Sequence, residues 1–309
     1  MIVTVTLNPS LHVSYETERV SLGAANRVSR VSYRAGGRGL TVARVLHTFG
    51  HDVVAAGLAG GASGEMIRAE LARDGVATQF TWINGESRRV LEVADGSSGA
   101  VTAFSEPAPY ITTEELGRLA ADYRSLMADA TAAVLCGSLP SGLPAETYGS
   151  LATYAAESGV PVVLDAGGSA LWHAVTRRPA LVIPEMSADG PEVGDPAALV
   201  ASGAAAVAVL SGGGVSAVTA QGTWSASLPG PRAAAASRDT IVAGFVPGIA
   251  LNWSWPDTLA HATALAASSG PEGDVDLEAY ERLLPGVVVT CRPTAASKYH
   301  ADPISPQSS

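Results

Sequence analysis

Short apolar runs alternate with longer stretches of helical periodicity along most of the chain. The apolar runs predict strands at Ile2–Leu7, Val53–Leu58, Ala132–Leu135, Val160–Leu164, Ala180–Ile183 and Ala206–Leu210. The stretches between them predict helices at Thr41–Thr48, Gly64–Asp74, Thr113–Ala128 and Ala145–Ser158. Because nearly continuous apolar strands alternate with helices, we expect an α/β fold with a mostly parallel sheet and helices on both faces.

Two segments interrupt this alternation. Residues 12–33 and 85–104 read as short strands of alternating polarity, with turn signals at Gly23, at Asp95-Gly96 and at Gly99. Such patterning is typical of exposed sheet rather than of a buried parallel strand. We therefore expect a small β-rich excursion from the main α/β fold.

Composition narrows the class of protein. Of the 309 residues, 47% are hydrophobic and 16% are charged, which fits a compact globular chain rather than a disordered one. The net charge of −10 argues against a general binder of nucleic acids or acidic membranes. No apolar stretch approaches the roughly 20 residues needed to span a bilayer, and residues 1–7 lack the basic region of a signal peptide. We expect a cytoplasmic protein with no nucleic-acid or membrane partner.

The segment from residue 34 to residue 46 is the strongest chemical signal in the sequence. Glycines at positions 36, 37 and 39 are followed by a helical run that carries Arg38 and Arg44. Glycine lets the backbone approach a ligand closely, and a helix N-terminus presents unpaired N–H groups at the positive end of its dipole. Guanidinium groups add forked donors for phosphate or carboxylate. The segment therefore predicts a site for an anion, as in a small phosphorylated molecule.

Other segments accompany this one in a characteristic order. They are the stretch from Val3 to His12, Asn26-Arg27, the glycines from Gly57 to Gly64, residues 105–109, Gly137 to Gly142, Leu164 to Gly168 and Asp239 to Phe245. In this order the sequence resembles the PfkB (ribokinase-like) sugar kinases, in the 1-phosphofructokinase and tagatose-6-phosphate kinase branch. The resemblance covers roughly residues 1 to 290.

The resemblance implies a ribokinase-like three-layer sandwich with a small β lid over the substrate. Its α/β domain would comprise residues 1–11, 35–84 and 105–292, its lid residues 12–34 and 85–104, and residues 293–309 would form a flexible tail. It also implies ATP-dependent phosphorylation of a sugar phosphate, with ATP and Mg²⁺ as cofactors. A homodimer formed through the lid is the oligomer we expect.

Asp239 is the main catalytic candidate. From the sequence alone it also reads as the N-cap of a helix, because Asp is a favoured capping residue. The resemblance makes it the general base that takes the proton of the sugar hydroxyl. The family writes Gly-Ala-Gly before this Asp, where the chain has Ala236, Ser237 and Arg238. Arg238 would then either stabilise the transferring phosphoryl group as an arginine finger or obstruct the site.

The nucleotide and magnesium side also departs from the family. Its Lys-Pro-Asn is replaced by Ile183-Pro184-Glu185, and either Glu185 or Asp189 would have to hold Mg²⁺. A solvated acidic loop is the alternative interpretation of this segment. Ser211, Gly212 and Gly214 lie in a segment that resembles the family's nucleotide loop, with Gly212 kept and the last glycine replaced by Val215. Ala236 and Ser237 occupy the place of its anion hole.

The substrate side retains its basic residues and has lost its readers of sugar hydroxyls. The resemblance implies that Arg27, Arg38, Arg44 and Arg88 hold the substrate phosphate, with Gly37, Gly39 and Ser138 beside them. His12 and Thr41 stand where the family has Asp and Asn. Because buried hydroxyl readers discriminate strongly between ligands, these changes predict a different sugar or relaxed selection.

Two functions remain in view. The first is a kinase with Asp239 as base, and the second is a catalytically impaired homologue that binds a sugar phosphate or nucleotide without efficient turnover. A dinucleotide-binding Rossmann enzyme is rejected, because the Gly36 to Gly39 segment lacks the required glycine spacing and the acidic residue that should follow it.

Overall fold

The apolar runs form the central strands of a ten-stranded sheet in the part of the chain that this computed structural model describes, residues 1–185, 195–211, 214–229, 237–270 and 273–293. Its parallel part runs in the order β5 (Ala77–Trp82), β4 (Val53–Ala59), β1 (Ile2–Thr6), β8 (Ala132–Cys136), β9 (Val162–Asp165), β10 (Leu181–Val182) and β11 (Ala206–Ser211). An antiparallel meander follows, formed by β12 (Gly214–Thr219), β13 (Gly222–Ser227) and β14 (Val288–Pro293).

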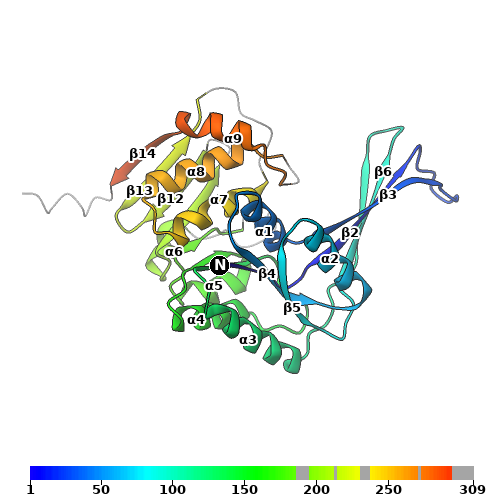
Figure 1. Ribbon diagram of the computed structural model, residues 1–309, viewed down its shortest axis with the longest axis horizontal. Helices are drawn as coiled ribbons and strands as arrows, with labels where there is room; N and C mark the ends of the chain where they lie inside the picture. The colour runs from blue at the N-terminus through cyan, green and yellow to red at the C-terminus, as the bar shows by residue number, and fades with distance from the viewer. Residues whose placement is uncertain (186–194, 212–213, 230–236, 271–272, 294–309) are drawn as a thin grey trace, which may run out of the picture.

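Helices cover both faces of this sheet (Figure 1). One face carries α1 (Arg38–Thr48), α2 (Gly61–Arg73), α7 (Arg238–Ala250), α8 (Trp255–Ala267) and α9 (Leu277–Leu283), the last followed by the short turn η1 (Leu284–Gly286). The other carries α3 (Thr113–Met127), α4 (Thr147–Glu157), α5 (Gly168–Val175) and α6 (Pro196–Ala201). Each face has its own apolar core, which is the three-layer arrangement expected from the alternation of strands and helices.

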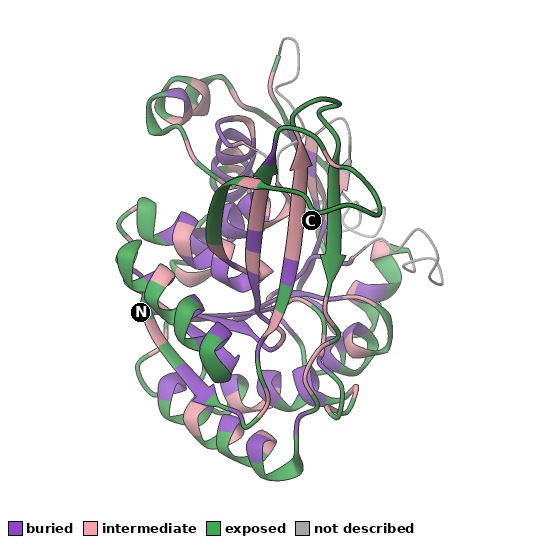
Figure 2. Ribbon diagram, turned by 90° about the vertical axis from the view of Figure 1, so that its right-hand side faces the viewer, coloured by how far each residue is buried: buried purple, intermediate pink, exposed green. Residues whose placement is uncertain are grey.

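The two polar-alternating segments form a separate four-stranded sheet in the order β3-β2-β6-β7. Its strands are β2 (Ser10–Thr17), β3 (Val28–Gly36), β6 (Arg88–Asp95) and β7 (Val101–Ser105). This lid projects from the body beside α2, which packs against β2 and β3 (Figure 1). Figure 2 shows that β7 is exposed along its length, whereas β2 and β6 carry buried and intermediate residues.

Boundaries shift by a few residues, and the chemistry of the sequence explains most of the shifts. The strand expected from Val160 begins at Val162, since Val160 closes the end of α4 with a backbone bond to Ala155. The helix expected from Thr41 begins at Arg38, because Gly37 is its N-cap and Gly39 lies in its first turn. Pro293, which we placed in the tail, is the last residue of β14, and residues 294–309 lie outside the described part of the chain.

The described helices include none that is both long and apolar enough to cross a membrane.

Candidate active site

A large cleft of about 1350 Å³ opens over the carboxyl ends of the parallel strands and beneath the lid. Its walls come from β1, the lid strands β2, β3 and β6, the first turns of α1 and α7, and the 273–275 loop. Carboxyl ends of parallel strands meet at one edge of a sheet, where ligands of open α/β folds bind. The cleft therefore lies where the topology predicts a site.

Strand register sets the floor of this cleft. Thr6 pairs with Cys136, and Cys136 pairs with Asp165, so the ends of β1, β8 and β9 lie in one row. Residues just beyond this row, among them Asn8 and Ser138, line the cleft. Asn8 donates from Nδ2 to Ser138 Oγ at 3.1 Å, which joins the loops after β1 and β8.

The first turn of α1 lies directly on β1, and glycine is required for that approach. Gly37, the N-cap of α1, has φ +130, and a Cβ there would lie 2.8 Å from the Thr6 side chain. A Cβ on Gly39 would lie 2.4 Å from Thr6 Oγ1. The sequence signal at these glycines therefore reflects helix–sheet packing as well as access for a ligand.

Asp239 lies in the first turn of α7, with its carboxylate in the cleft. The N-cap is Ser237, so the interpretation of Asp239 as the helix cap is wrong. The side chain of Ser237 makes no capping hydrogen bond, and α1 likewise has no side-chain cap. Two helix N-termini with free N–H groups thus meet at the same cleft, an arrangement that favours an anion.

Burial raises the pKa of Asp239 to about 6, and repulsion by Asp165 adds to the effect. Arg38, a hydrogen bond from Thr41 and Arg238 lower the same pKa without cancelling the rise. A carboxylate with such a pKa can accept a proton near neutral pH, as a general base must.

Arg238, the first residue of α7, is directed toward the sheet. Its Nε and Nη2 donate to Asp165 Oδ1 at 2.9 and 2.7 Å. Nη2 also donates to the carbonyl oxygens of Ile183 and Pro184 at 2.8 and 2.9 Å. The guanidinium therefore connects α7 to the ends of β9 and β10.

Arg38 connects the same region to α1. Its Nη2 donates to Glu185, and its Nη1 lies 3.5 Å from Asp165 Oδ2. Glu185, the residue expected to hold Mg²⁺, is thus occupied by a guanidinium. Among the described residues no group of three or more His, Cys, Asp or Glu side chains that could hold a metal occurs. Asp189 lies outside them.

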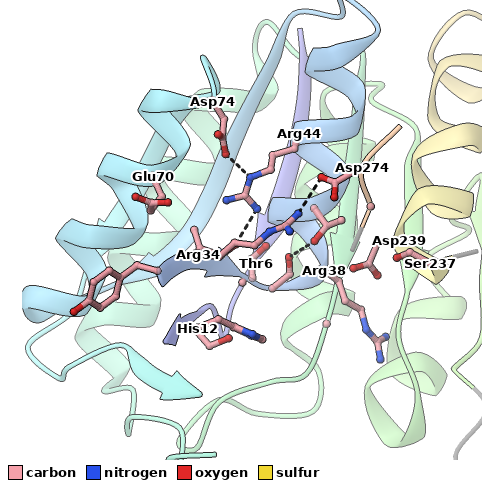
Figure 3. A pocket seen from close by; sticks show the side chains of 18 of the residues that line it. Thr6, His12, Arg34, Arg38, Arg44, Glu70, Asp74, Ser237, Asp239 and Asp274 are labelled. Atoms are coloured by element: carbon pink, nitrogen blue, oxygen red, sulfur yellow. Dashed lines mark hydrogen bonds and ion pairs between the residues drawn. The ribbon is translucent and has the colours of Figure 1, made fainter. Parts of the chain in front are cut away.

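The substrate end of the cleft holds several expected residues together. His12, Thr41, Arg88 and Ser138 all line it, and Figure 3 shows His12 across the cleft from Asp239. Burial lowers the pKa of His12, whose Nδ1 lies 4.0 Å from Glu92. Arg88 forms no ion pair with any described residue, and its buried Nε lacks a hydrogen-bond partner. It is the basic side chain best prepared to receive an anion.

Other expected residues lie elsewhere or have partners of their own. Arg44 lines the cleft, yet Nε donates to Asp74 Oδ2 at 2.5 Å and Nη1 to the Ala35 carbonyl at 2.8 Å (Figure 3). Arg27 is exposed in the loop between β2 and β3 and does not line the cleft. At Gly214 a Cβ would meet the Ala226 carbonyl oxygen of β13 at 2.3 Å, so this glycine allows β12 to lie close to β13. Ser211 ends β11, and Gly212 and Ala236 lie outside the described residues.

Sequence reasoning missed three polar residues of the site. Thr6 Oγ1 and Asn8 Oδ1 are buried without a hydrogen-bond partner among the described residues, and both residues line the cleft. Asp165 is fully buried and binds both arginines. The available signal was position, since Thr6 and Asp165 end parallel strands and Asn8 follows one.

The pfkB family carbohydrate kinase profile matches residues 10–187. The match covers more than half of the chain, and the chain belongs to this family. A solved structure of the tetrameric inhibited form of phosphofructokinase-2 from Escherichia coli superposes with a TM-score of 0.81 at 25% identity, over 92% of this chain and 98% of that one. The expected ribokinase-like fold class is thereby confirmed.

Two curated relatives are tagatose-6-phosphate kinases of Staphylococcus epidermidis strains. One is 37% identical over 55% of this chain and 54% of that protein. The other is 35% identical over 60% of each. The matched part of the chain thus spans little more than half the length of these relatives.

The raised pKa of Asp239 should make stability fall as pH rises. Because the folded pKa of about 6 exceeds the ordinary value of 3.8, the native state binds more protons between these values, and the free energy of unfolding decreases across that window. Asp239→Asn cannot ionise, so it should lack this decrease. Its free energy of unfolding relative to wild type should therefore rise by up to about 3 kcal/mol between pH 4 and pH 7. Urea unfolding across this pH range measures the effect. Asp52→Asn, at an exposed carboxylate, is the control, and equal pH dependence in Asp239→Asn and wild type would contradict the expectation.

Proposed function

We propose that the protein transfers the γ-phosphoryl group of ATP to a hydroxyl group of a sugar phosphate, with Asp239 as general base. The observation that carries this proposal is the position of Asp239, whose pKa is raised to about 6, in a polar cleft between two helix N-termini without side-chain caps. Membership of the pfkB family supports it.

The phosphate of the substrate is assigned to the end of the cleft under the lid. Arg88 supplies a cation without a carboxylate partner among the described residues, and His12 lies beside it. Asn8 and Ser138 offer polar groups to the sugar hydroxyls. Arg44 keeps the α1–β3 wall in place through Asp74 and the Ala35 carbonyl. The relatives named as tagatose-6-phosphate kinases favour a ketose phosphate as substrate.

The reaction follows from this placement. Asp239 accepts the proton of the attacking hydroxyl, the hydroxyl oxygen forms a bond to the γ-phosphorus, and ADP leaves with the electrons of the broken P–O bond. The free N–H groups at the start of α7 face the transferred group and offset its developing charge. ATP is assigned to the side of Ser237 and the ends of β10 and β11. Magnesium enters with ATP, and no carboxylate of the chain is assigned to it.

The decisive experiment measures ADP release with MgATP and a panel that includes tagatose 6-phosphate and fructose 1-phosphate. Asp239→Asn should abolish turnover and leave calorimetric binding of the sugar phosphate in place, because it removes the base without changing size. Turnover close to wild type in this variant would refute the role of Asp239. Binding of a sugar phosphate without turnover in the wild type would favour the impaired homologue.

Arg88 should carry much of the affinity for the substrate phosphate. Arg88→Ala should weaken sugar-phosphate binding by about 1.5 to 3 kcal/mol, the range for a hydrogen bond to a charged group. Isothermal titration calorimetry gives the dissociation constant. The neighbouring Arg89, which is paired with Glu106 outside the cleft, provides the matched control in Arg89→Ala. Equal affinity in both variants would remove Arg88 from the site.

We further propose that the lid forms a homodimer through its outer face. Cross-strand pairs place Val31 opposite Tyr15, and Tyr33 opposite Val13, on one face, which Leu91 and Phe104 extend. Val31, Tyr33 and Phe104 are 45%, 46% and 58% exposed, and such an apolar patch is typical of an interaction surface. The opposite face, with His12, Ser14 and Ser32, lines the cleft, which Tyr33 also borders. Val13 is buried, and Tyr15 and Leu91 pack against the core, so the exposed patch consists of Val31, Tyr33 and Phe104.

The dimer is tested by charging one face of the lid at a time. Val31→Asp should shift the sedimentation equilibrium of the protein toward the monomer, because a carboxylate would be buried without a partner in the interface. Ser32→Asp places the same charge on the adjacent residue of the opposite face and should leave the oligomer unchanged. A monomeric wild type at every concentration would contradict the proposal.

A further inference from the structure

Asp165 is the only carboxylate among the described residues that pairs with both Arg38, which lines the cleft, and Arg238, which precedes the cleft residue Asp239. It ends β9 with 0% exposure, and each oxygen faces a different guanidinium: Oδ1 lies 2.7 Å from Arg238 Nη2 and Oδ2 lies 3.5 Å from Arg38 Nη1. A carboxylate without partners in such a place would carry a large desolvation cost. The two arginines therefore offset the cost of burying the Asp165 side chain.

The same contacts fix the direction of both arginines. Arg238 is further held by the carbonyl oxygens of Ile183 and Pro184, and Arg38 by Glu185. Neither arginine forms an ion pair with Asp239, although both are close enough to lower its pKa. Their N–H donors point to the ends of β9 and β10 and not to the carboxylate of Asp239.

We propose that Asp165 is a positioning residue, which holds Arg38 and Arg238 on the sheet side of the cleft so that Asp239 stays free to accept a proton. The inference rests on the proposed function only for the use made of that proton. It replaces the arginine-finger interpretation of Arg238 with a connection between α7 and the sheet. Because Arg238 immediately precedes Asp239, this connection also fixes where the carboxylate of Asp239 lies.

The charged and titratable groups around Asp239 predict that two variants change the pKa of Asp239 in opposite directions. Asp165 on β9 repels the ionised form, while Arg38 on α1 and Arg238 on α7 attract it; the remaining titratable neighbour is the buried thiol of Cys136 on β8. Asp165→Asn removes the repulsion and releases both arginines, so the pKa of Asp239 should fall from about 6. Arg238→Ala removes an attraction and leaves Asp165 with one partner, so the pKa should rise.

The experiment is a ¹³C-carboxyl NMR titration of the full chain without substrate, with the Asp239 signal assigned through Asp239→Asn. Glu115→Gln is the control, because Glu115 is also a buried carboxylate but caps α3 far from the cleft. We expect a lower pKa in Asp165→Asn, a higher one in Arg238→Ala and no change in Glu115→Gln. If Asp165→Asn does not fold, the rise in Arg238→Ala still decides. An unchanged Asp239 pKa in Arg238→Ala would overturn the proposal.

Kinetics give a second readout. With the substrate identified, Asp165→Asn should lower kcat by roughly 10- to 100-fold, the cost of a misplaced catalytic group, and move the acid limb of the pH profile to lower pH. A large loss of kcat in Arg238→Ala with an unchanged Asp239 pKa would restore the arginine finger and overturn the proposal. If the wild type shows no turnover but the two variants shift the pKa of Asp239 as expected, the kinase assignment is refuted and the positioning role of Asp165 still holds.

Discussion

The parallel register of β1, β8 and β9 is the constraint on which the site depends. It aligns Thr6, Cys136 and Asp165 at one edge of the sheet, with every strand buried on both faces. The chain after each of these strands therefore continues on the same side, toward the lid and the starts of α1 and α7. A slip of one residue in β9 would move Asp165 to the opposite face and leave both arginines without their shared partner.

Helix–sheet packing brings two helix N-termini to that edge. Gly37 and Gly39 allow α1 to approach β1 more closely than any side chain would permit. The free N–H groups at the starts of α1 and α7 therefore reach the same cleft. The positive ends of both helix dipoles and the cation of Arg88 add to one another there. The two helix contributions come from the backbone, and that of Arg88 comes from a side chain outside the altered motifs.

The sequence predicted the layers of this fold well, because buried parallel strands and amphipathic helices differ in the spacing of their apolar residues. It also brought His12, Thr41, Ser138 and Asp239 to one place through the family resemblance, and the structure shows each of them lining the cleft. The partners of the arginines were not predictable. Whether a guanidinium faces a ligand or a carboxylate depends on which side chains lie within a few ångströms, and residues such as Asp74 and Asp165 are distant in sequence from Arg44 and Arg238. Strand ends were the one signal that pointed to Asp165.

The arginine that precedes Asp239 is best understood together with the carboxylates around it. Arg238 places a cation next to Asp239, and an unrestrained cation there would lower the pKa of that carboxyl further. Asp165 and the carbonyl oxygens of Ile183 and Pro184 bind that cation. Arg38 at the same time occupies Glu185, which would otherwise be available to a metal ion. The cleft therefore balances its carboxylates with guanidinium groups of the chain itself, and Asp239 is the one acidic group at its centre that forms no ion pair with a described residue.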